Sequence, residues 1–339
     1  MAKTTEILIT LPLNEQQLDS LHQLSENISI SHIPTSDPED ISSEIWEKTE
    51  VLYSDSIFPE SDQAPLLRWI QCLAEKKDCP PDNLILERDE IKVTTVEGLN
   101  AIQVAEHTVG LLLALSRKLP DLFNLQENNE WLNNRPKGYA PLDIFGSTVG
   151  IVGYNRIGRQ IARLLKGFGC TILASKQNAM SPKNVGFVPK GTGDPDGEYF
   201  TRLYPHQAIR SMFKESNSVI ITTAFSELTR NLVGEKQLEV LKPTAMLVDV
   251  SEGGVLNLEA LTDHLADNRI AGAALDAFPT VPLPSDSLLW SLPNVIISPD
   301  IAGYSNNQSQ RNFNLFAKNL SKYLDGQELF NQMSPRAGK

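Results

Sequence analysis

The sequence predicts an α/β protein with doubly wound parallel sheets, and three observations carry this prediction. Short β-rich runs alternate with helical patterns through about the first hundred residues, which is the rhythm of an α/β unit. From residue 148 onwards, a second series of runs is apolar on both faces, as parallel strands buried under helices must be. Within this series a glycine cluster follows a strand and opens a helix. The length of 339 residues favours two domains.

The amino-terminal series begins with a strand and a helix. Its runs are, in order, the strand "EILITL" (6–11), the helical "NEQQLDSLHQLS" (14–25), and the strands "ISISHI" (28–33) and "VLYSD" (51–55). Residues 102–119, "IQVAEHTVGLLLALSRKL", have the length and apolar density of a long buried helix that ends before Pro120. Such a helix could carry the chain from one domain into the other.

The second series contains six apolar runs. They are "TVGIVG" (148–153), "TILAS" (171–175), "SVIITTA" (218–224), "AMLVDV" (245–250), "AGAALD" (271–276) and "NVIISP" (294–299). Helical patterns such as "RIGRQIARLLKGFG" and "NLEALTDHLA" lie between them, so a doubly wound sheet follows. The stretch 180–205 is rich in Gly, Pro and charged residues and predicts a surface excursion.

Charge and cysteine content exclude several classes of protein. A formal net charge of −12 does not favour nucleic acid or an anionic membrane surface as a partner. The three cysteines are odd in number and form no CxxC pair, which argues against a disulfide framework or a cysteine metal site. The apolar run near the N-terminus is broken by Glu6 and closed by Pro12, which suits a strand better than a signal peptide. We therefore expect a cytoplasmic protein.

The glycine cluster resembles a dinucleotide-binding turn. It reads Gly153, Tyr154, Asn155, Arg156, Ile157, Gly158, and its place after a strand and before a helix predicts a Rossmann domain. Asn155 stands where the middle glycine of such a turn lets the backbone approach a pyrophosphate. The asparagine side chain occupies volume that the phosphates would need.

Further stretches extend the resemblance over most of the chain. They are "LRWIQCLA", "GLNAIQVAEHTVGLLLALSRKLP", "TVGIVGYNRIGRQIA", "LKPTAMLVDVSEGGVLNLEAL", "AGAALDAFPTVPLPSDSLLWSLPNVIISPDIAG" and the final helix. Together they resemble the D-isomer-specific 2-hydroxyacid dehydrogenase family. The resemblance implies a flavodoxin-like substrate domain of residues 1–103 plus 298–339, into which a Rossmann dinucleotide-binding domain of residues 104–297 is inserted. It also implies a homodimer and a small-molecule ligand in the interdomain cleft.

The family reduces 2-keto acids with a nicotinamide, and its substrate-clamping arginine is replaced in this chain. The family motif N-x-x-R-G-G reads here Asp249, Val250, Ser251, Glu252, Gly253, Gly254, so the clamp position holds Glu252. An anionic substrate needs a guanidinium fork. Two unit charges about 4 Å apart at an effective dielectric near 20 interact by roughly 4 kcal/mol. Exchanging attraction for repulsion therefore weakens binding by several kcal/mol.

The proton relay of the family is also replaced. Its glutamate position, before a proline in "LDAFPTVP", holds Val281, and its histidine position in "SPDIAG" holds Asp300. An aspartate with an ordinary pKa near 4 is ionised at neutral pH and cannot donate the proton for ketone reduction. The five histidines lie at positions 22, 32, 107, 206 and 264, none of which is the relay position.

Both ligand subsites depart from the family pattern. The substrate loop, usually similar to "SAGVD", reads Ala74, Glu75, Lys76, Lys77, Asp78, and its long charged side chains crowd a turn that should offer bare N–H groups. At the end of the second Rossmann strand, Ser175 and Lys176 stand where an acidic residue would bind the ribose, which favours NADP over NAD if a dinucleotide binds. Asp276 resembles the family's contact to the nicotinamide carboxamide.

Each of these positions also has a purely structural interpretation. Gly153 and Gly158 could simply permit tight packing of helix on strand. Asp276 could cap the loop that follows its strand, and Asp300 could be a helix N-cap or a solvated carboxylate. His107, within the long helix, is expected to be a packed core residue.

Three hypotheses follow for the function. The first is a catalytically inactive relative, a binding or regulatory protein that uses the dehydrogenase scaffold. The second is an active NAD(P)-dependent oxidoreductase with altered specificity, because Glu252, Val281 and Asp300 give a formal charge of −2 that attracts a cation, an amine or a divalent metal. The third is structural: Lys76 or Lys77 could pair with Glu252 or Asp300 and hold the two domains together.

Overall fold

The chain folds into two compact units. The computed structural model describes residues 4–73, 88–133, 139–181, 183 and 187–333. One unit consists of residues 1–99 and 306–339, and the other consists of residues 100–305. Each unit has a parallel sheet of its own, so the predicted fold class of two doubly wound α/β domains is confirmed.

The first unit has the flavodoxin-like strand order. Its five parallel strands are arranged β2-β1-β3-β4-β5. The strands are β1 (Thr5–Ile9), β2 (Ile28–His32), β3 (Val51–Ser54), β4 (Trp69–Cys72) and β5 (Lys92–Thr94). The helices are α1 (Glu15–His22), η1 (Pro38–Asp40), α2 (Ser43–Lys48) and, from the other end of the chain, α10 (Gln308–Leu324).

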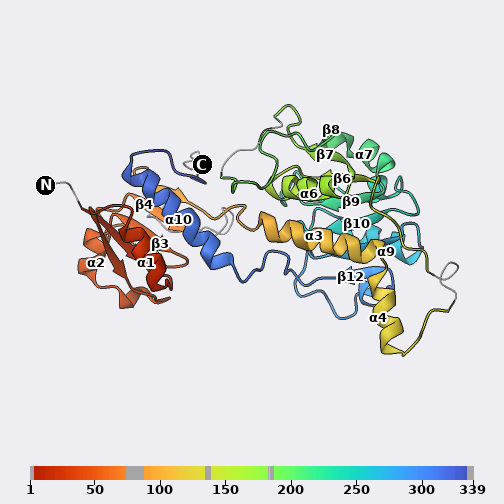
Figure 1. The fold of residues 1–339 in the computed structure, drawn as a ribbon, viewed down its shortest axis with the longest axis horizontal. Coiled ribbons are helices and arrows are strands. Elements are labelled where there is room, and N and C mark those ends of the chain that lie inside the picture. The colour runs from red at the N-terminus through yellow and green to blue at the C-terminus, as the bar shows by residue number, and fades with distance from the viewer. Residues whose placement is uncertain (1–3, 74–87, 134–138, 182, 184–186, 334–339) are drawn as a thin grey trace. The chain divides into compact units, whose positions relative to one another are not determined.

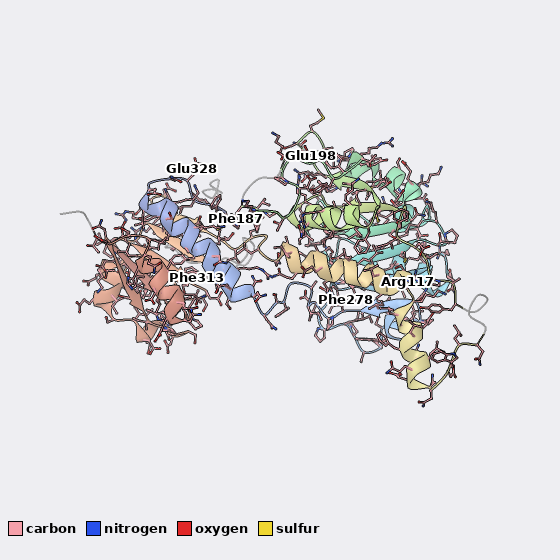
Figure 2. The ribbon with its side chains drawn as sticks, viewed as in Figure 1. Arg117, Phe187, Glu198, Phe278, Phe313 and Glu328 are labelled. Atoms are coloured by element: carbon pink, nitrogen blue, oxygen red, sulfur yellow. The ribbon has the colours of Figure 1, made fainter. Side chains whose placement is uncertain are left out.

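Helices cover both faces of this sheet. Leu21 of α1 and Phe313 of α10 pack on the face that carries Ile7 and Trp69. Figure 2 labels Phe313 on α10. Trp46 of α2 packs on the opposite face. Helix α1 begins at a capping box, in which the Asn14 side chain and the third helical residue satisfy each other's backbone N–H groups. The last helix of the chain therefore completes the core of the first unit.

The second unit is a Rossmann fold with seven strands. Its sheet is parallel and has the order β12-β11-β10-β9-β6-β7-β8, so the strand order reverses between β6 and β9. The strands are β6 (Thr148–Val152), β7 (Thr171–Lys176), β8 (Arg202–Pro205), β9 (Ser218–Ile221), β10 (Met246–Asp249), β11 (Gly272–Leu275) and β12 (Val295–Ile297). The helices are α3 (Ala101–Ser116), α4 (Leu119–Glu127), α6 (Arg156–Gly167), η3 (His206–Ala208), α7 (Ile209–Glu215), α8 (Glu235–Leu238), α9 (Leu258–Ala266) and η4 (Leu288–Ser291).

The sheet of the second unit is buried between two helical layers. Helices α3 and α6 lie side by side on one face (Figure 1). Leu112 of α3 and Ile161 of α6 pack there against strand residues such as Ile151. Helices α7, α8 and α9 cover the other face. Strands β9, β10 and β11 have four residues each, and every one of these residues is buried. The apolar character of these runs on both faces is thereby explained.

An irregular segment takes the place of a crossover helix between β7 and β8. The described residues between these two strands contain no helix, and the segment is held instead by hydrogen bonds to the side chain of Asp194. Figure 2 labels Glu198 within it. The sequence predicted a surface excursion here, but Asp194 itself is buried. The excursion is thus anchored to the unit from inside.

The long helix that the sequence predicts over residues 102–119 is two helices. Helix α3 ends at Ser116, and α4 begins at Leu119 and contains Pro120 in its first turn. Lys118 between them adopts the left-handed conformation, with φ of 53°. A proline is tolerated in a first helical turn, so Pro120 opens the second helix rather than closing the first. Within the described residues, neither helix, nor any other, combines the length and hydropathy needed to cross a bilayer.

Candidate functional site

Two of the three positions that match the family's catalytic set lie at one edge of the second sheet. Strands β10, β11 and β12 are neighbours and run parallel, so their carboxyl ends meet at the same edge. Glu252 and Asp300 follow β10 and β12 closely, whereas Val281 lies further along the loop after β11. Glu252 and Asp300 therefore lie at the edge at which open α/β sheets bind ligands.

Glu252 is attached to a neighbouring loop. One of its carboxylate oxygens accepts the backbone N–H of Phe225, at 3.4 Å. The two glycines that follow it have φ of 79° and 81°, and both are closely packed. A Cβ atom on Gly253 would lie 2.3 Å from the carbonyl oxygen of Phe278, and one on Gly254 would lie 2.8 Å from the Phe225 ring. Only glycine fits these positions, so the backbone that presents Glu252 is tightly constrained.

Asp276 holds the turn that carries Asp300. One of its carboxylate oxygens accepts the Ser298 hydroxyl and the N–H of Ile301 at 3.1 Å, and the other accepts the N–H of Ala302 at 3.0 Å. The side chain is buried, and a buried carboxylate needs such partners. The bonded turn follows β12 and not β11, so Asp276 does not cap the loop after its own strand in these contacts, and its role towards a nicotinamide stays a prediction.

Asp300 is a turn residue and not a helix cap. Its φ is 56°, and its N–H donates to the carbonyl oxygens of Asp276 and Ser298 at 3.2 and 3.1 Å. Helix α10 begins only at Gln308, so the expectation of an N-cap at Asp300 is wrong. The reason is that the turn after β12 is closed by Asp276, several residues before the helix. Val281, which precedes a cis proline, is exposed.

His107 is a polar neighbour of this turn. Its Nε2 atom lies 2.8 Å from the Ser298 hydroxyl and 3.6 Å from the Asp276 carboxylate. We expected a packed core residue, but the ring faces polar groups and is 27% exposed. The periodicity of the helix could not show this, because Ser298 and Asp276 are far away in the sequence. Ser298 itself escaped the sequence analysis, although a polar residue directly after an apolar strand is a usable signal.

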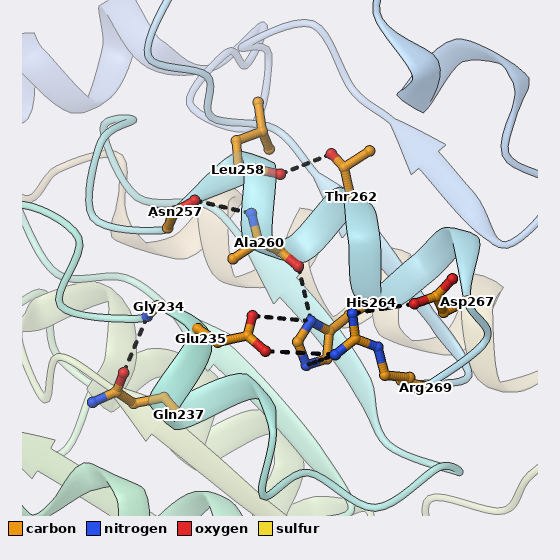
Figure 3. Close-up of polar contacts among 10 residues, drawn as sticks. All are labelled: Gly234, Glu235, Gln237, Asn257, Leu258, Ala260, Thr262, His264, Asp267 and Arg269. Atoms are coloured by element: carbon orange, nitrogen blue, oxygen red, sulfur yellow. Dashed lines mark hydrogen bonds and ion pairs between the residues drawn. The ribbon is translucent and has the colours of Figure 1, made fainter.

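Another histidine of the second unit belongs to a separate cluster. His264, on α9, is buried, and its Nδ1 atom lies 2.8 Å from the carbonyl oxygen of Ala260 (Figure 3). Glu235 lies beside the same ring, with Arg269 as its ion-pair partner (Figure 3). This cluster joins α8 to α9. Across the described ranges, no group of three or more His, Cys, Asp or Glu residues is placed to hold a metal ion.

The glycine turn is filled by the side chain of Asn155. This residue caps α6, because its Oδ1 atom accepts the N–H of Gly158 at 3.0 Å. Its Nδ2 atom donates to the carbonyl oxygen of Thr222, after β9, at 2.6 Å. The side chain thus spans from β6 to β9, where the strand order reverses and a dinucleotide would lie. The N–H of Gly158, which opens the helix, is therefore already hydrogen-bonded within the chain.

Packing alone accounts for the two retained glycines. A Cβ on Gly153, where φ is 102°, would meet the backbone of Thr223 at 2.8 Å, and one on Gly158 would lie 2.2 Å from the carbonyl oxygen of Gly153. Arg156 and Ile157 form the start of α6, and both are half-buried. The turn therefore requires glycine at both ends, whether or not a dinucleotide binds.

Ser175 and Lys176 end β7 at the same edge. The Ser175 hydroxyl is buried and lies 3.3 Å from Nδ1 of His206, whose pKa is lowered by burial. Lys176 donates to the carbonyl oxygen of Ser181 at 2.7 Å. Burial and the nearby charge of Arg159 lower the pKa of Lys176. The ammonium group is thus turned towards the segment that follows its strand.

Known proteins place this chain in one family. The model of the "D-isomer specific 2-hydroxyacid dehydrogenase, NAD binding domain" matches residues 109–302. The glyoxylate reductase of Thermococcus gammatolerans is 32% identical over 276 residues, covering 78% of this chain and 76% of the relative. The chain belongs to the D-isomer specific 2-hydroxyacid dehydrogenase family. The glyoxylate reductase of Thermococcus onnurineus is 33% identical over 254 residues, covering 73% and 71%.

Solved structures of the family share the fold. A D-isomer specific 2-hydroxyacid dehydrogenase family protein from Aeromonas salmonicida superposes with a TM-score of 0.72, at 22% identity and over 98% of this chain and 99% of the other. An acyclic imino acid reductase in complex with NADPH and D-Arg has a TM-score of 0.68, at 20% identity and over 97% and 100%. The predicted family and its NAD(P)-dependent oxidoreductase scaffold are thereby confirmed.

The family's substrate loop cannot be compared. Its counterparts Glu75, Lys76 and Lys77 lie outside the described residues. The hypothesis that a lysine there pairs with Glu252 or Asp300 therefore stays a prediction. The roles assigned to the remaining site residues stay predictions.

Asp249, which stands where the family motif has asparagine, carries a perturbed carboxyl group. The side chain is buried at the end of β10, and it accepts the N–H of Ser251 at 3.0 Å. Burial raises the pKa of Asp249 to about 6, and the negative charge of Asp276 adds to this rise. A second carboxyl group, that of Asp249, thus lies at the end of the strand that precedes Glu252.

We expect Asp276→Asn to loosen the turn after β12. An amide has one acceptor oxygen, so the N–H of Ile301 or that of Ala302 loses its partner, at a cost of about 1–3 kcal/mol. Hydrogen exchange of these two amides should become faster. Asp286→Asn, an equal change of charge on an exposed loop, serves as the control. Unchanged exchange at residues 301 and 302 would show that Asp276 does not hold the turn.

We expect Asp249→Asn to change the pH dependence of stability. Because the folded pKa of about 6 exceeds the ordinary value near 4, the folded state holds this proton more tightly. The stability contributed by Asp249 is complete below pH about 4 and is lost as the pH rises to about 6. Relative to the variant, the native protein should lose about 2–3 kcal/mol of unfolding free energy between these values. Urea denaturation at several pH values measures this, and parallel profiles would contradict it.

Proposed function

We propose that this family member has lost, or strongly reduced, hydride transfer on 2-hydroxy and 2-keto acids and acts as a binding or regulatory homologue. One observation carries the proposal. The segments after β10, β11 and β12 carry Glu252, Val281 and Asp300, with a formal charge of −2, where the family's arginine, glutamate and neutral histidine sum to zero. An anionic substrate meets repulsion there, and no group at these three positions replaces the histidine as proton donor.

The glycine turn supports weak dinucleotide binding. Asn155 already bonds the N–H of Gly158, which a pyrophosphate would otherwise approach, and it bridges to Thr222. A bound dinucleotide has to displace these contacts. Lys176 in place of an acidic residue favours NADP over NAD, because an ammonium group attracts the 2′-phosphate.

A reductase acting on a cationic substrate is the second candidate. The formal charge of −2 at the three positions favours an amine or an imine over a carboxylate. The same fold carries chemistry of this kind in the acyclic imino acid reductase. Asp300 would then face a substrate nitrogen rather than a ketone oxygen.

Assembly and domain limits are further parts of the proposal. We propose a cytoplasmic homodimer, with domains of residues 1–103 plus 298–339 and of residues 104–297, and a small-molecule ligand in the interdomain cleft. Leu122 and Phe123 on α4 and the nearby Trp131 are exposed, and α4 leads away from its sheet (Figure 1). Such apolar exposure supports a subunit contact.

We expect the native protein to reduce glyoxylate with NADPH or NADH at no more than about one thousandth of the rate of an ordinary family member, because clamp and proton donor are both absent. The triple variant Glu252→Arg, Val281→Glu, Asp300→His should gain activity, since it restores attraction and the relay. Phe225→Leu, beside Glu252, is the control. Native turnover comparable to ordinary members would refute the proposal. Turnover with amine or imine substrates alone would favour the second candidate.

We expect Asn155→Gly to bind NADPH about tenfold more tightly than the native protein. The change frees the N–H of Gly158 and the space of the side chain, and glycine as N-cap costs only about a few tenths of a kcal/mol. Asn155→Asp, which keeps the capping oxygen and adds a negative charge, should bind more weakly than the native protein. Calorimetric titration measures all three affinities. Equal affinity of the native and glycine proteins would show that Asn155 is no obstacle.

A further inference from the structure

Helix α3 contacts the turn after β12 at two points that lie one helical turn apart. The Nε2 atom of Gln103 donates to the carbonyl oxygen of Gly303 at 3.2 Å. Further along the same helix, Nε2 of His107 lies 2.8 Å from the Ser298 hydroxyl. Residues spaced in this way lie on the same face of a helix, so both ends of the turn rest against one side of α3. We name residues 298–303 the Asp300 turn.

The directions of the hydrogen bonds along this contact follow from the groups involved. Both oxygens of Asp276 accept backbone N–H groups, as an ionised carboxylate does, so the single proton of the Ser298 hydroxyl points to Asp276. The hydroxyl oxygen can then only accept from His107, and Nε2 of the ring carries a proton in both charge states. Nδ1 is therefore the ring nitrogen that gains or loses the second proton.

Carboxylates outnumber cations among the charged groups around the ring. Asp276, directly after β11, lies 3.6 Å from Nε2. Asp249 ends β10, where the charge of Asp276 adds to the burial that raises its pKa. Asp300 belongs to the turn itself, and Glu106 precedes the histidine on α3. The neighbouring helix α6 contributes one positive charge in its first turn, that of Arg156.

A charged ring strengthens the chain of side chains from α3 to Asp276. A proton gained at Nδ1 places a positive charge close to the carboxylate and makes the Nε2–H group a stronger donor to Ser298. The ring is 27% exposed, so this proton can be exchanged with water. A neutral ring keeps the hydrogen bond but loses the attraction between charges.

We propose that His107 is a positioning residue for the Asp300 turn, acts through Ser298 and Asp276, and holds the turn more firmly in its charged form than in its neutral form. The turn is tightened as the pH falls through the range in which imidazoles gain a proton, and it is loosened as the pH rises. Asp300 moves with this turn, because its N–H donates to the carbonyl oxygens of Asp276 and Ser298. The inference goes beyond the proposed function and needs neither ligand nor turnover.

A simpler alternative gives the ring a packing role alone. His107 would then fill space beside the turn, and its charge would have no effect on the turn. The two interpretations differ in their response to pH. A packing residue leaves the stability of the turn unchanged across the imidazole range, whereas a positioning residue raises it in acid.

The test is amide hydrogen exchange of the full chain, expressed as protection factors at residues 301 and 302. Because Asp249, with its pKa of about 6, titrates in the same range, every protein compared carries Asp249→Asn. We expect protection about fivefold higher at pH about 5.5 than at pH about 8, since hydrogen bonds to charged groups are the stronger ones. His107→Gln keeps a neutral N–H donor and should show no rise in acid. His22→Gln, the same change at an exposed histidine of the first unit, should leave the rise intact.

A second variant covers the case in which His107→Gln does not fold. Ser298→Ala removes the oxygen between ring and carboxylate, so we expect a smaller rise in acid, and Ser298→Thr, which keeps the hydroxyl, should retain the full rise. An undiminished rise in His107→Gln or in Ser298→Ala overturns the proposal, as does protection that does not change with pH in the parent. Native glyoxylate reduction would refute the proposed function and leave this result standing.

Discussion

The conformation of the turn after β12, in the second unit, depends on one buried carboxylate. Asp276 directly follows β11 and accepts the hydroxyl of Ser298, directly after β12, and two backbone N–H groups from the turn beyond it. His107 approaches the same group from α3. An unsatisfied carboxylate at this depth would cost several kcal/mol, so strand, turn and helix are fixed together. The left-handed backbone at Asp300 is a consequence, since the turn has to present its N–H groups to Asp276. Whatever Asp300 contacts, its position is set by Asp276.

Side chains also bond backbone N–H groups at other positions that match the family's ligand-binding motifs. Asn155 accepts the N–H of Gly158, and Glu252 accepts the N–H of Phe225. In both cases a side-chain oxygen of this protein bonds a backbone N–H group near the carboxyl ends of the strands. The apolar strands beneath these bonds are closely packed on both faces of the sheet.

The fold could be predicted from the sequence because its signals are local. Runs that are apolar on both faces, such as residues 245–250, show buried parallel strands, and the glycine turn marks the start of a helix. The positions of Glu252 and Asp300 at one edge also follow from strand order. The contacts of these residues could not be predicted, because they join segments that lie far apart in the chain: Asp276 with Ala302, His107 with Ser298, and Tyr154 with Asp194. The break between α3 and α4 was missed because a left-handed Lys118 has no signal in the sequence, and Pro120 suits either interpretation.

The cap on α6 has a consequence for how the protein responds to its surroundings. In a protein whose phosphate turn is completed by its cofactor, the folded fraction rises with the concentration of that cofactor by mass action. Here Asn155 completes the turn from within, so the bond that orders the helix start is present in every copy of the chain. The order of the helix start therefore does not require a bound nucleotide, although a nucleotide that binds the folded unit still stabilises it by mass action.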